Sequence, residues 1–197
     1  MKIAAVLMAA GNSRRFGNAN KLLAPFQGWP LVAHAASTLR SLSLTHLIAV
    51  VADLDVAMHL TGFEIANAPA ANDMAQNIAL GVNAARAFGA ERVLIALADM
   101  PLVPHAHFVS IIAACTDTLP SASDDGTRRL PPACFPACYF DQLVSLAGDN
   151  GAAQIIKNLP QSSIILDTTG ALADADYPQD LSRMTNLSRM TGSNACH

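Results

Sequence analysis

Small, hydroxyl and cationic residues are concentrated directly behind the first apolar run of the chain, residues 3–8. The segment reads Ala9-Ala10-Gly11-Asn12-Ser13-Arg14-Arg15-Phe16-Gly17 and is followed by Lys21. Small residues let the main chain approach an anion closely, backbone N–H groups at a turn or helix start point at the anion, and cations neutralise it. We therefore predict a polyphosphate-binding turn after a strand, although the pattern is neither G-x-G-x-x-G nor G-x-x-x-x-G-K-[ST].

Two other interpretations of this segment stay open. Met1-Lys2 and the apolar stretch behind it have the outline of a secretory signal that ends in small residues. Alternatively, a buried first strand is followed by a solvated basic loop that binds no ligand. The phosphate interpretation is favoured by Arg14-Arg15 directly after the apolar run, and by an acidic motif downstream that needs this strand as its neighbour.

Carboxylates in two distant parts of the chain have the chemistry of magnesium ligands. Asp99 follows the apolar run 93–98, which places it at the carboxyl end of a strand, where open α/β sheets bind ligands. Asp174 and Asp176 precede a proline at the start of a predicted terminal helix, and one of them could return to face Asp99. Mg²⁺ takes one or two protein carboxylates and fills its other positions with water and substrate phosphates. Asp99 and Asp176 together would form such a site.

Each of these carboxylates also has a structural interpretation. Asp174 and Asp180 could cap the terminal helix, where their charge would be favourable. Asp99 could form the turn before Met100-Pro101, because aspartate is common in turns. For Asp176 we favour metal binding, and partnership with the N-terminal turn favours it for Asp99 as well.

Strand-length apolar runs alternate with stretches of helical spacing, which is the pattern of a parallel sheet with crossover helices. The runs span residues 3–8, 47–52, 93–98 and 164–166, and apolar residues with helical spacing lie within residues 78–85, 108–115 and 140–147. Near-continuous apolar strands imply that helices cover both faces of the sheet. We predict an α/β fold with three layers, doubly wound around a mostly parallel sheet.

Residues 117–132 interrupt this alternation. They are rich in Ser, Asp, Pro and Gly, carry Arg128-Arg129, and could line or cover an active site. We expect a single domain over residues 1–191, whereas residues 192–197 should form a frayed tail.

Composition narrows the class of partner. With 52% hydrophobic and 14% charged residues the chain should be globular, and its net charge of −3 argues against an extended nucleic-acid surface. No apolar run reaches the roughly 18 residues that cross a bilayer, so we expect no membrane segment and a cytoplasmic protein that binds small molecules.

Cysteines and histidines show no metal-binding pattern. The cysteines have neither zinc-ligand nor disulfide-framework spacing, and we expect reduced thiols at Cys115, Cys134, Cys138 and Cys196. His105 and His107 lie at a predicted helix start, where we expect both to be solvated.

Taken together, the motifs resemble those of the molybdenum cofactor nucleotidyltransferases over nearly the whole chain. The resemblance rests on Met8-Ala9-Ala10-Gly11-x-Ser13-x-Arg15-Phe16-Gly17-x-x-x-Lys21-Leu22-Leu23, Leu97-Ala98-Asp99-Met100-Pro101, Gly148-Asp149-x-Gly151-Ala152 and Asp174-x-Asp176-x-Pro178-x-Asp180-Leu181. Ala9-Ala10-Gly11 is similar to the cytidylyltransferase branch, whereas the guanylyltransferase branch usually has two glycines there. The resemblance implies a Rossmann-like nucleotidyltransferase fold and the reaction of CTP with molybdopterin to give molybdopterin cytosine dinucleotide and pyrophosphate.

The resemblance also implies roles for individual residues. It places the nucleotide on Ala9, Ala10, Gly11, Ser13, Asn72 and Asn77, its phosphates on Arg15 and Lys21, and Mg²⁺ on Asp99 and Asp176. The implied catalytic residues are Arg15, Lys21 and Asp99, which would stabilise charge while a phosphate oxygen of the acceptor attacks the α-phosphorus in line. An ionised phosphate needs no general base, so no Ser-His-Asp or Cys-His set is required.

Two departures from the family pattern leave the substrates open. Ala75-Gln76-Asn77 stands where small hydroxyl residues are common, so GTP or ATP could replace CTP. Arg129-Leu130-Pro131-Pro132-Ala133 replaces the Arg-Gly-His-Pro of many relatives, so the acceptor could be a sugar phosphate or another small phosphate. The motifs would also suit a non-catalytic nucleotide-binding module that delivers cofactor to a molybdoenzyme or its chaperone, or a regulatory phosphate-binding domain without metal chemistry.

Overall fold

The structure is a computed structural model that describes residues 1–11, 16, 20–149 and 151–192, with side chains described as far as residue 188. Two predicted site residues, Ser13 and Arg15, lie outside the described residues, and so does Cys196. The same holds for the expected frayed tail apart from Gly192, which is helical.

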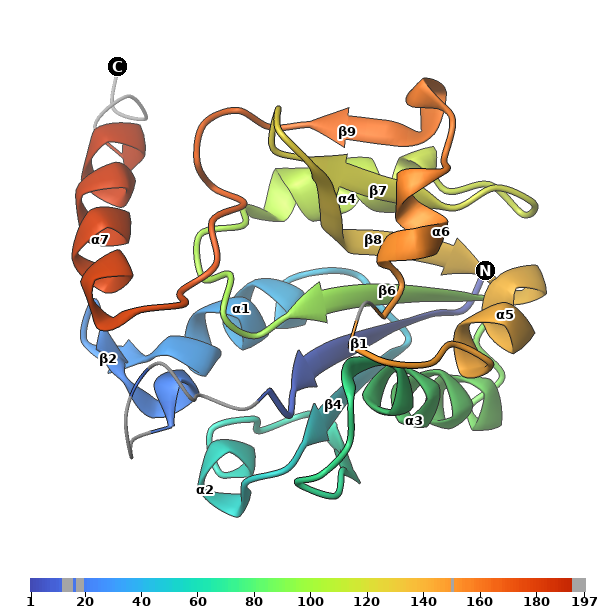
Figure 1. Ribbon diagram of the computed structural model, residues 1–197, viewed down its shortest axis with the longest axis horizontal. Helices are drawn as coiled ribbons and strands as arrows, with labels where there is room; N and C mark the ends of the chain where they lie inside the picture. Colours follow the sequence, from blue (N-terminus) through green and yellow to red (C-terminus); the bar gives the residue numbers. More distant parts are fainter. Residues whose placement is uncertain (12–15, 17–19, 150, 193–197) are drawn as a thin grey trace.

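A seven-stranded sheet forms the centre of the fold, in the order β5-β4-β1-β6-β8-β7-β9 (Figure 1). Its strands are β1 (Ile3–Ala9), β4 (His46–Val51), β5 (Glu64–Asn67), β6 (Arg92–Leu97), β7 (Ser121–Asp124), β8 (Arg129–Pro136) and β9 (Ile164–Leu166). β8 is antiparallel to both β6 and β7, and the other neighbouring pairs are parallel. The prediction of a mostly parallel sheet is confirmed, and the four predicted apolar runs are strands β1, β4, β6 and β9.

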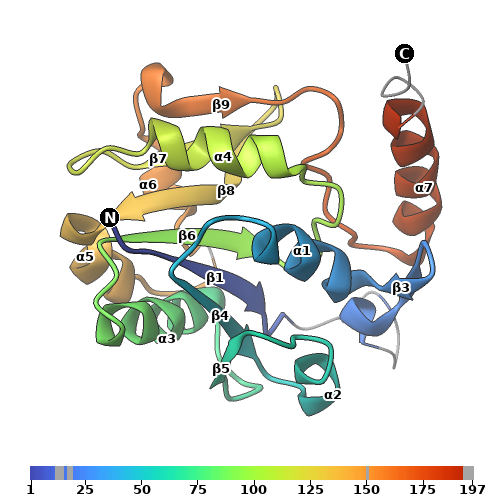
Figure 2. The ribbon, with the colours of Figure 1, turned by 180° about the vertical axis from the view of Figure 1, so that it is seen from behind.

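Helices cover both faces of the sheet, which confirms the three layers (Figures 1 and 2). The face toward the viewer in Figure 1 carries α3 (Met74–Ala87), α5 (Phe140–Val144), which is shorter than predicted, and α6 (Ala153–Lys157). The opposite face, seen in Figure 2, carries α1 (Leu31–Arg40) and α4 (His105–Ala114). Side chains of β1 alternate between the two cores, with Leu7 packed on the α1 and α4 side and Val6 on the α3 side.

Helix α3 packs closely on the centre of the sheet because a glycine lies at the contact. A Cβ added to Gly81 would lie 2.3 Å from Val6 Cγ1 and 3.0 Å from Val50 Cγ2. Only glycine lets the helix come this close to β1 and β4. A capping box between Asp73 and Gln76 begins the helix, and it fixes the position of the first turn at the carboxyl edge of the sheet.

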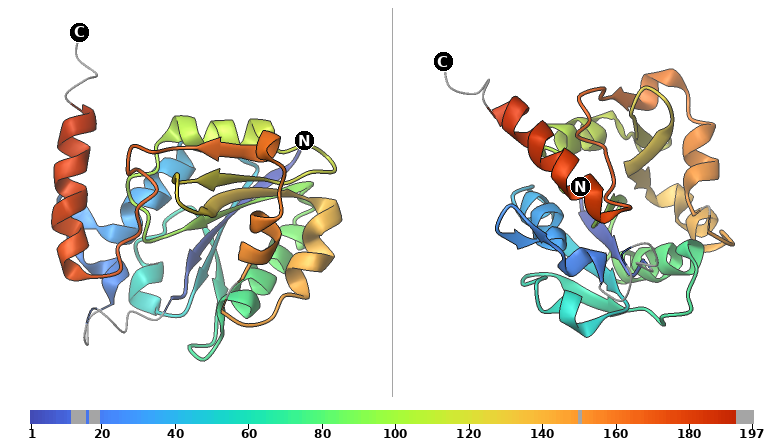
Figure 3. Two further views of the ribbon diagram at one scale, coloured as in Figure 1. Left: turned by 45° about the horizontal axis from the view of Figure 1, so that its top comes forward. Right: turned by 60° about the vertical axis from the view of Figure 1, so that its left-hand side comes forward.

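The predicted terminal helix is confirmed as α7 (Pro178–Gly192), which stands beside the small hairpin of β2 (Pro25–Phe26) and β3 (Trp29–Pro30) (Figure 3). Gln27 Nε2 in the hairpin turn donates a hydrogen bond to Ser188 Oγ at 2.6 Å, and Met184 is buried. The shorter elements are α2 (Leu54–Ala57) and the 3₁₀ turns η2 (Lys21–Leu23), η3 (Ala137–Tyr139) and η4 (Gln161–Ser163). None of the helices in the described ranges has the length and apolar character needed to cross a bilayer.

Residues 117–132 are more regular than predicted. They contain β7 and the first half of β8, joined by a turn in which the Asp125 carboxylate accepts hydrogen bonds from the backbone N–H groups of Thr127 and Arg128 at 2.8 Å each. The apolar pattern missed β7 because the strand buries serines. Ser121 Oγ donates to a carbonyl of α4 at 2.5 Å, which satisfies the hydroxyl inside the core.

Candidate active site

One lysine and two carboxylates meet at the carboxyl end of β6. Lys21 Nζ lies 2.5 Å from Asp99 Oδ2 and 3.7 Å from Asp176 Oδ1, and the lysine side chain is only 12% exposed. We call these three side chains the acidic trio. Carboxylate oxygens such as those of Asp99 and Asp176 are ligands that Mg²⁺ takes from protein.

Hydrogen bonds to the main chain hold two members of the acidic trio in place. Asn20 Oδ1 accepts a hydrogen bond from Leu22 N at 3.0 Å and thereby caps the turn η2 that presents Lys21. Asp99 lies two residues beyond the end of β6, and its carbonyl accepts from the N–H of Ala175 at 2.9 Å. This bond ties the segment before α7 to the end of β6, which brings two distant parts of the sequence together.

The structure assigns the capping of α7 to Asp180 rather than to Asp174. Asp180 Oδ2 accepts from the backbone N–H groups of Asp176 and Tyr177 at 3.1 and 2.7 Å. The bonding holds the main chain of Asp176 in place while its carboxylate joins the trio. Asp174 Oδ2 instead lies 3.6 Å from Arg128 Nη2.

A cavity of about 60 Å³ opens beside the trio, between β1, η2 and the start of α3. Five of the predicted site residues line it, namely Ala10, Gly11, Lys21, Asn77 and Asp99. Among the described residues, a Cβ added to Gly11 would meet nothing within 4 Å, so no neighbouring side chain fills the space at this main chain. An anion has room to approach the backbone there.

The other predicted site residues are placed differently. Ala9 is buried at the end of β1 and packs in the core on the α1 side. Asn72 belongs to the turn before α3, where its N–H donates to Pro69 O at 3.0 Å, and it does not line the small cavity. Asp176 does not line the small cavity, but its carboxylate forms an ion pair with Lys21, which does.

Asn77 is a buried amide whose oxygen has no hydrogen-bond partner among the described residues. The residue is 5% exposed in the first turns of α3, and within the described part of the chain its Oδ1 accepts no hydrogen bond. Buried side-chain polar atoms are nearly always hydrogen-bonded. Asn77 therefore has an acceptor to offer to a ligand that brings an N–H or O–H group into the small cavity.

A larger cavity of about 450 Å³ adjoins the small one and shares Met8, Met74 and Leu97 with it. Its lining is apolar except for four charged residues, Arg128, Arg129, Asp149 and Asp174. The volume lies in the range of small-molecule sites. Part of segment 117–132, together with the rest of β8, thus lines a cavity next to the trio.

A second trio of polar residues is buried between α4 and the β7–β9 end of the sheet. His107 Nε2 lies 2.8 Å from Ser123 Oγ, and His107 Nδ1 lies 3.9 Å from Asp167 Oδ2. Ser123 Oγ donates its proton to Pro132 O at 2.9 Å, so the imidazole donates to the hydroxyl rather than activating it. We call this arrangement the buried clamp, because its serine is fully buried and lines neither of the two cavities.

The prediction that both histidines at the start of α4 are solvated is wrong for His107. His105 is exposed, but His107 faces the sheet from the first turn of the helix. Burial lowers the pKa of His107, and the nearby charge of Asp167 partly opposes this effect. The surroundings of His107 therefore favour the neutral form of its imidazole.

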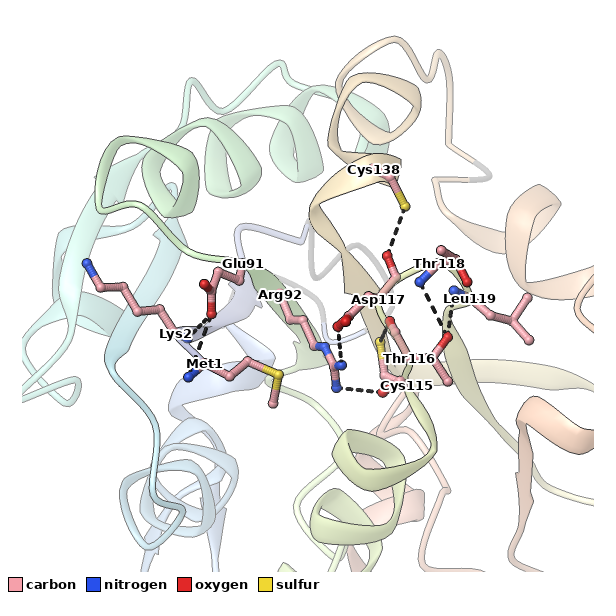
Figure 4. Close-up of polar contacts among 10 residues, drawn as sticks. All are labelled: Met1, Lys2, Glu91, Arg92, Cys115, Thr116, Asp117, Thr118, Leu119 and Cys138. Carbon is pink, nitrogen blue, oxygen red and sulfur yellow. Dashed lines mark hydrogen bonds and ion pairs between the residues drawn. The ribbon is translucent and has the colours of Figure 1, made fainter.

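The opposite end of β6 carries a polar cluster that contains none of the predicted site residues (Figure 4). Arg92 Nη2 donates to Asp117 Oδ1 at 2.7 Å, and Nη1 donates to Cys115 O at 2.5 Å, which ties β6 to the end of α4. Glu91 Oε2 accepts from Lys2 N at 2.6 Å and secures the start of β1. These contacts hold the fold together on the side remote from Lys21.

The sequence analysis missed the apolar residues that shape the larger cavity. Ile78 and Ile156 have the spacing of core residues, and periodicity does not tell a side chain that faces a cavity from one that faces the core. It also missed Asn20, although an asparagine directly before a helical turn is a recognisable N-cap.

The acidic trio lies at the carboxyl edge of a mostly parallel sheet, beside the small residues that follow β1, which is where open α/β proteins bind their ligands. The family model described as MobA-like NTP transferase domain matches residues 5–163, and the chain belongs to this family. By family, therefore, the chain is a nucleotidyltransferase.

Individual proteins are similar to the chain along most of its length. The chain is 27% identical over 190 residues to the purine catabolism protein PucB of Bacillus subtilis (strain 168), a match that covers 89% of this chain and 92% of PucB. Two solved structures share the fold. Rv0371c from Mycobacterium tuberculosis H37Rv has a TM-score of 0.79 at 22% identity and covers 94% of this chain and 99% of its own.

The second structure is a nucleotidyl transferase from Methanothermobacter (Mth528), with a TM-score of 0.83 at 19% identity over 96% of this chain and 99% of that one. Rv0371c is also known as a complex with manganese, with a TM-score of 0.73 at 19% identity over 94% of this chain and 99% of that one.

Proposed function

We propose that this nucleotidyltransferase transfers CMP from CTP to the terminal phosphate of molybdopterin and releases pyrophosphate. The observation that carries the proposal is the convergence of Lys21, Asp99 and Asp176 beside the open main chain at Gly11. A triphosphate along that main chain would meet backbone N–H groups and a cation at one edge of the sheet. The choice of CTP and molybdopterin follows the resemblance of Ala9-Ala10-Gly11 to the cytidylyltransferase branch.

The acidic trio has the donor chemistry of a divalent-metal site that is completed by substrate. Asp99 and Asp176 supply the one or two carboxylates that Mg²⁺ takes from protein when phosphates and water fill its other positions. In the part of the chain that the structure describes, no group of three or more acidic, histidine or cysteine side chains could cage an ion alone. We assign Mg²⁺ to Asp99 and Asp176, and the manganese complex of Rv0371c supports a divalent ion. When bound, the ion would neutralise phosphate charge while the bond between the α-phosphorus and the departing pyrophosphate breaks.

The chain's own residues would position the substrate and stabilise charge. Lys21 is largely shielded from water, which strengthens its attraction for the departing pyrophosphate. The main chain of Ala10 and Gly11 would orient the triphosphate, and by the resemblance Ser13 and Arg15 would bind it as well. No side chain has to remove a proton, because the attacking phosphate oxygen is already ionised.

Recognition of the nucleoside would fall to Asn77. Its unpartnered Oδ1 would accept from a ribose hydroxyl or from the exocyclic amino group of the base. The roles of Ala9 and Asn72 rest on the resemblance alone.

Pyrophosphate release from CTP, GTP and ATP, each with molybdopterin, tests the proposal. We expect the fastest release with CTP and Mg²⁺, and its loss when EDTA removes the metal. Reactions without acceptor separate transfer from simple hydrolysis. Faster turnover with GTP would overturn the base assignment, whereas nucleotide binding without pyrophosphate release would indicate a delivery module instead.

A further inference from the structure

Two neighbouring arginines line the larger cavity, and Arg129 is held by several partners. Its Nη2 donates to Gln161 Oε1 at 3.1 Å, and its Nη1 donates to the carbonyls of Lys157, at 3.1 Å, and of Leu159. Its Nε lies 3.9 Å from Asp124 Oδ2. The guanidinium thus ties β8 to the end of α6, and three of its five N–H donors are already used within the fold.

Arg128 is held far more loosely. Its side chain is 62% exposed, with Nη2 at 3.6 Å from Asp174 Oδ2 and Nε at 3.7 Å from Asp125 Oδ2. Both contacts are longer than direct hydrogen bonds, and exposed ion pairs of this kind contribute little to stability. Arg128 can therefore exchange its partners at little cost.

The cavity behind Arg128 favours a ring system over a polyhydroxylated molecule. Apart from four charged residues its lining is apolar, and its volume is about 450 Å³. Hydroxyl groups buried against such a surface would lose their hydrogen bonds to water without replacement. A planar heterocycle would instead lay its apolar faces on the lining and keep its polar edge near the charged residues.

We propose that Arg128 recognises the acceptor: its guanidinium leaves Asp174 and binds the phosphate of a phosphomonoester whose ring system occupies the larger cavity. The inference rests on the proposed function: it names the residue that binds the acceptor and the chemical class of that acceptor. A phosphate suits the planar fork of arginine and carries more charge than a carboxylate, so the exchange is favourable.

The exchange would take place next to the acidic trio. Asp174 lies two residues before Asp176, and the residue between them, Ala175, donates to the carbonyl of Asp99 at 2.9 Å. A phosphate on Arg128 would therefore lie beside the segment that carries Asp176, and the nucleotide is expected at the acidic trio to which Asp176 belongs.

Binding of 6-hydroxymethylpterin phosphate, followed by pterin fluorescence with Mg²⁺ and α,β-methylene-CTP present, tests this assignment. Arg128→Ala should weaken binding about ten- to a hundredfold, the usual range for lost hydrogen bonds to a charged group. The same variant should bind unphosphorylated 6-hydroxymethylpterin as the wild type does. Asp174→Asn should bind the phosphate at least as tightly as the wild type, because the competing carboxylate is gone.

Arg86→Ala is the matched control, since Arg86 is an exposed arginine paired with Asp141 and does not line the cavity. It should change neither affinity. The assignment is overturned if Arg128→Ala binds the phosphate normally, if it loses both pterins equally, or if glucose 1-phosphate binds the wild type as tightly as the pterin phosphate. Titrations repeated without nucleotide keep Arg128 under test even if the CTP analogue fails to bind, which would contradict the proposed function instead.

Discussion

The acidic trio and the buried clamp each bring together three polar side chains from distant parts of the chain, but they differ in access. In the buried clamp, the Ser123 proton goes to a backbone carbonyl, and the serine and His107 are enclosed. In the acidic trio, Lys21 and Asp99 line a cavity. A serine, histidine and aspartate thus form a structural clamp here, and charged side chains beside an open cavity are the better mark of a functional site.

Removal of the Lys21 side chain from the acidic trio should have the largest effect on activity. We expect Lys21→Ala to lower kcat by about 10²–10³, or roughly 2.7–4 kcal/mol, as for loss of one well-placed charge-stabilising donor. Pyrophosphate release measures the effect, and circular dichroism shows whether the variant is folded. Lys21→Arg keeps the charge and should retain more activity. A folded Lys21→Ala enzyme with wild-type kcat would remove the lysine from the proposed site.

The buried clamp should respond in the opposite way. Ser123→Ala leaves the imidazole N–H and the Pro132 carbonyl without their partner, so we expect the free energy of unfolding to fall by about 1–3 kcal/mol. Urea denaturation measures this loss, while kcat should stay at the wild-type value because the clamp lines neither cavity. Loss of activity at unchanged stability would instead make Ser123 part of the chemistry.

Asn77 sharpens the comparison because it is buried yet unsatisfied. We expect Asn77→Ala to raise KM for CTP by about two- to tenfold, which corresponds to roughly 0.5–1.5 kcal/mol for one hydrogen bond. Stability should change little, because the lost oxygen has no partner in the described part of the chain. Asn158→Ala, at the end of α6, is the control and should leave KM unchanged. An unaltered KM for Asn77→Ala would assign the amide to structure.

The smallest effect should be a pH dependence of stability that belongs to the buried clamp. Burial lowers the pKa of His107 in the folded state, so the unfolded chain binds more protons between that lowered pKa and about 6.5. Stability from this residue is complete above pH about 6.5 and is lost as the pH falls through that window. Urea midpoints at decreasing pH should fall less for His107→Gln than for the wild type. Parallel curves for the two proteins would contradict this source of the pH dependence.

The sequence predicted strands most accurately where helices cover both faces of the sheet. β1 and β6 are apolar along nearly their whole length because helices cover both faces, and the runs that predicted them differ from the observed bounds by no more than a residue. β7 escaped prediction because its buried serines are satisfied by distant carbonyls, which only the folded chain provides. The single domain over residues 1–191 stays a prediction.

The site was predictable to the extent that topology dictates it. Carboxyl ends of adjacent parallel strands lie at one edge, so the proximity of Gly11 and Asp99 follows from β1 beside β6. Which aspartate near α7 turns inward depends on a backbone bond between Ala175 and Asp99 that no local pattern reveals. In the same way, Arg128 and Arg129 are neighbouring arginines that no sequence pattern tells apart. They differ in the folded chain because Arg129 donates to carbonyls at the end of α6.

Asp99 carries most of the proposed function, because it would hold a divalent ion at this edge of the sheet during nucleotidyl transfer. Pyrophosphate release from CTP and molybdopterin should be measured over a range of Mg²⁺ concentrations, for the wild type and for Asp99→Asn. We expect kcat to fall by about 10²–10³ in the variant, and more Mg²⁺ to be needed for the half-maximal rate. If a folded Asp99→Asn protein kept the rate and the Mg²⁺ dependence of the wild type, Asp99 would have no part in metal binding or transfer.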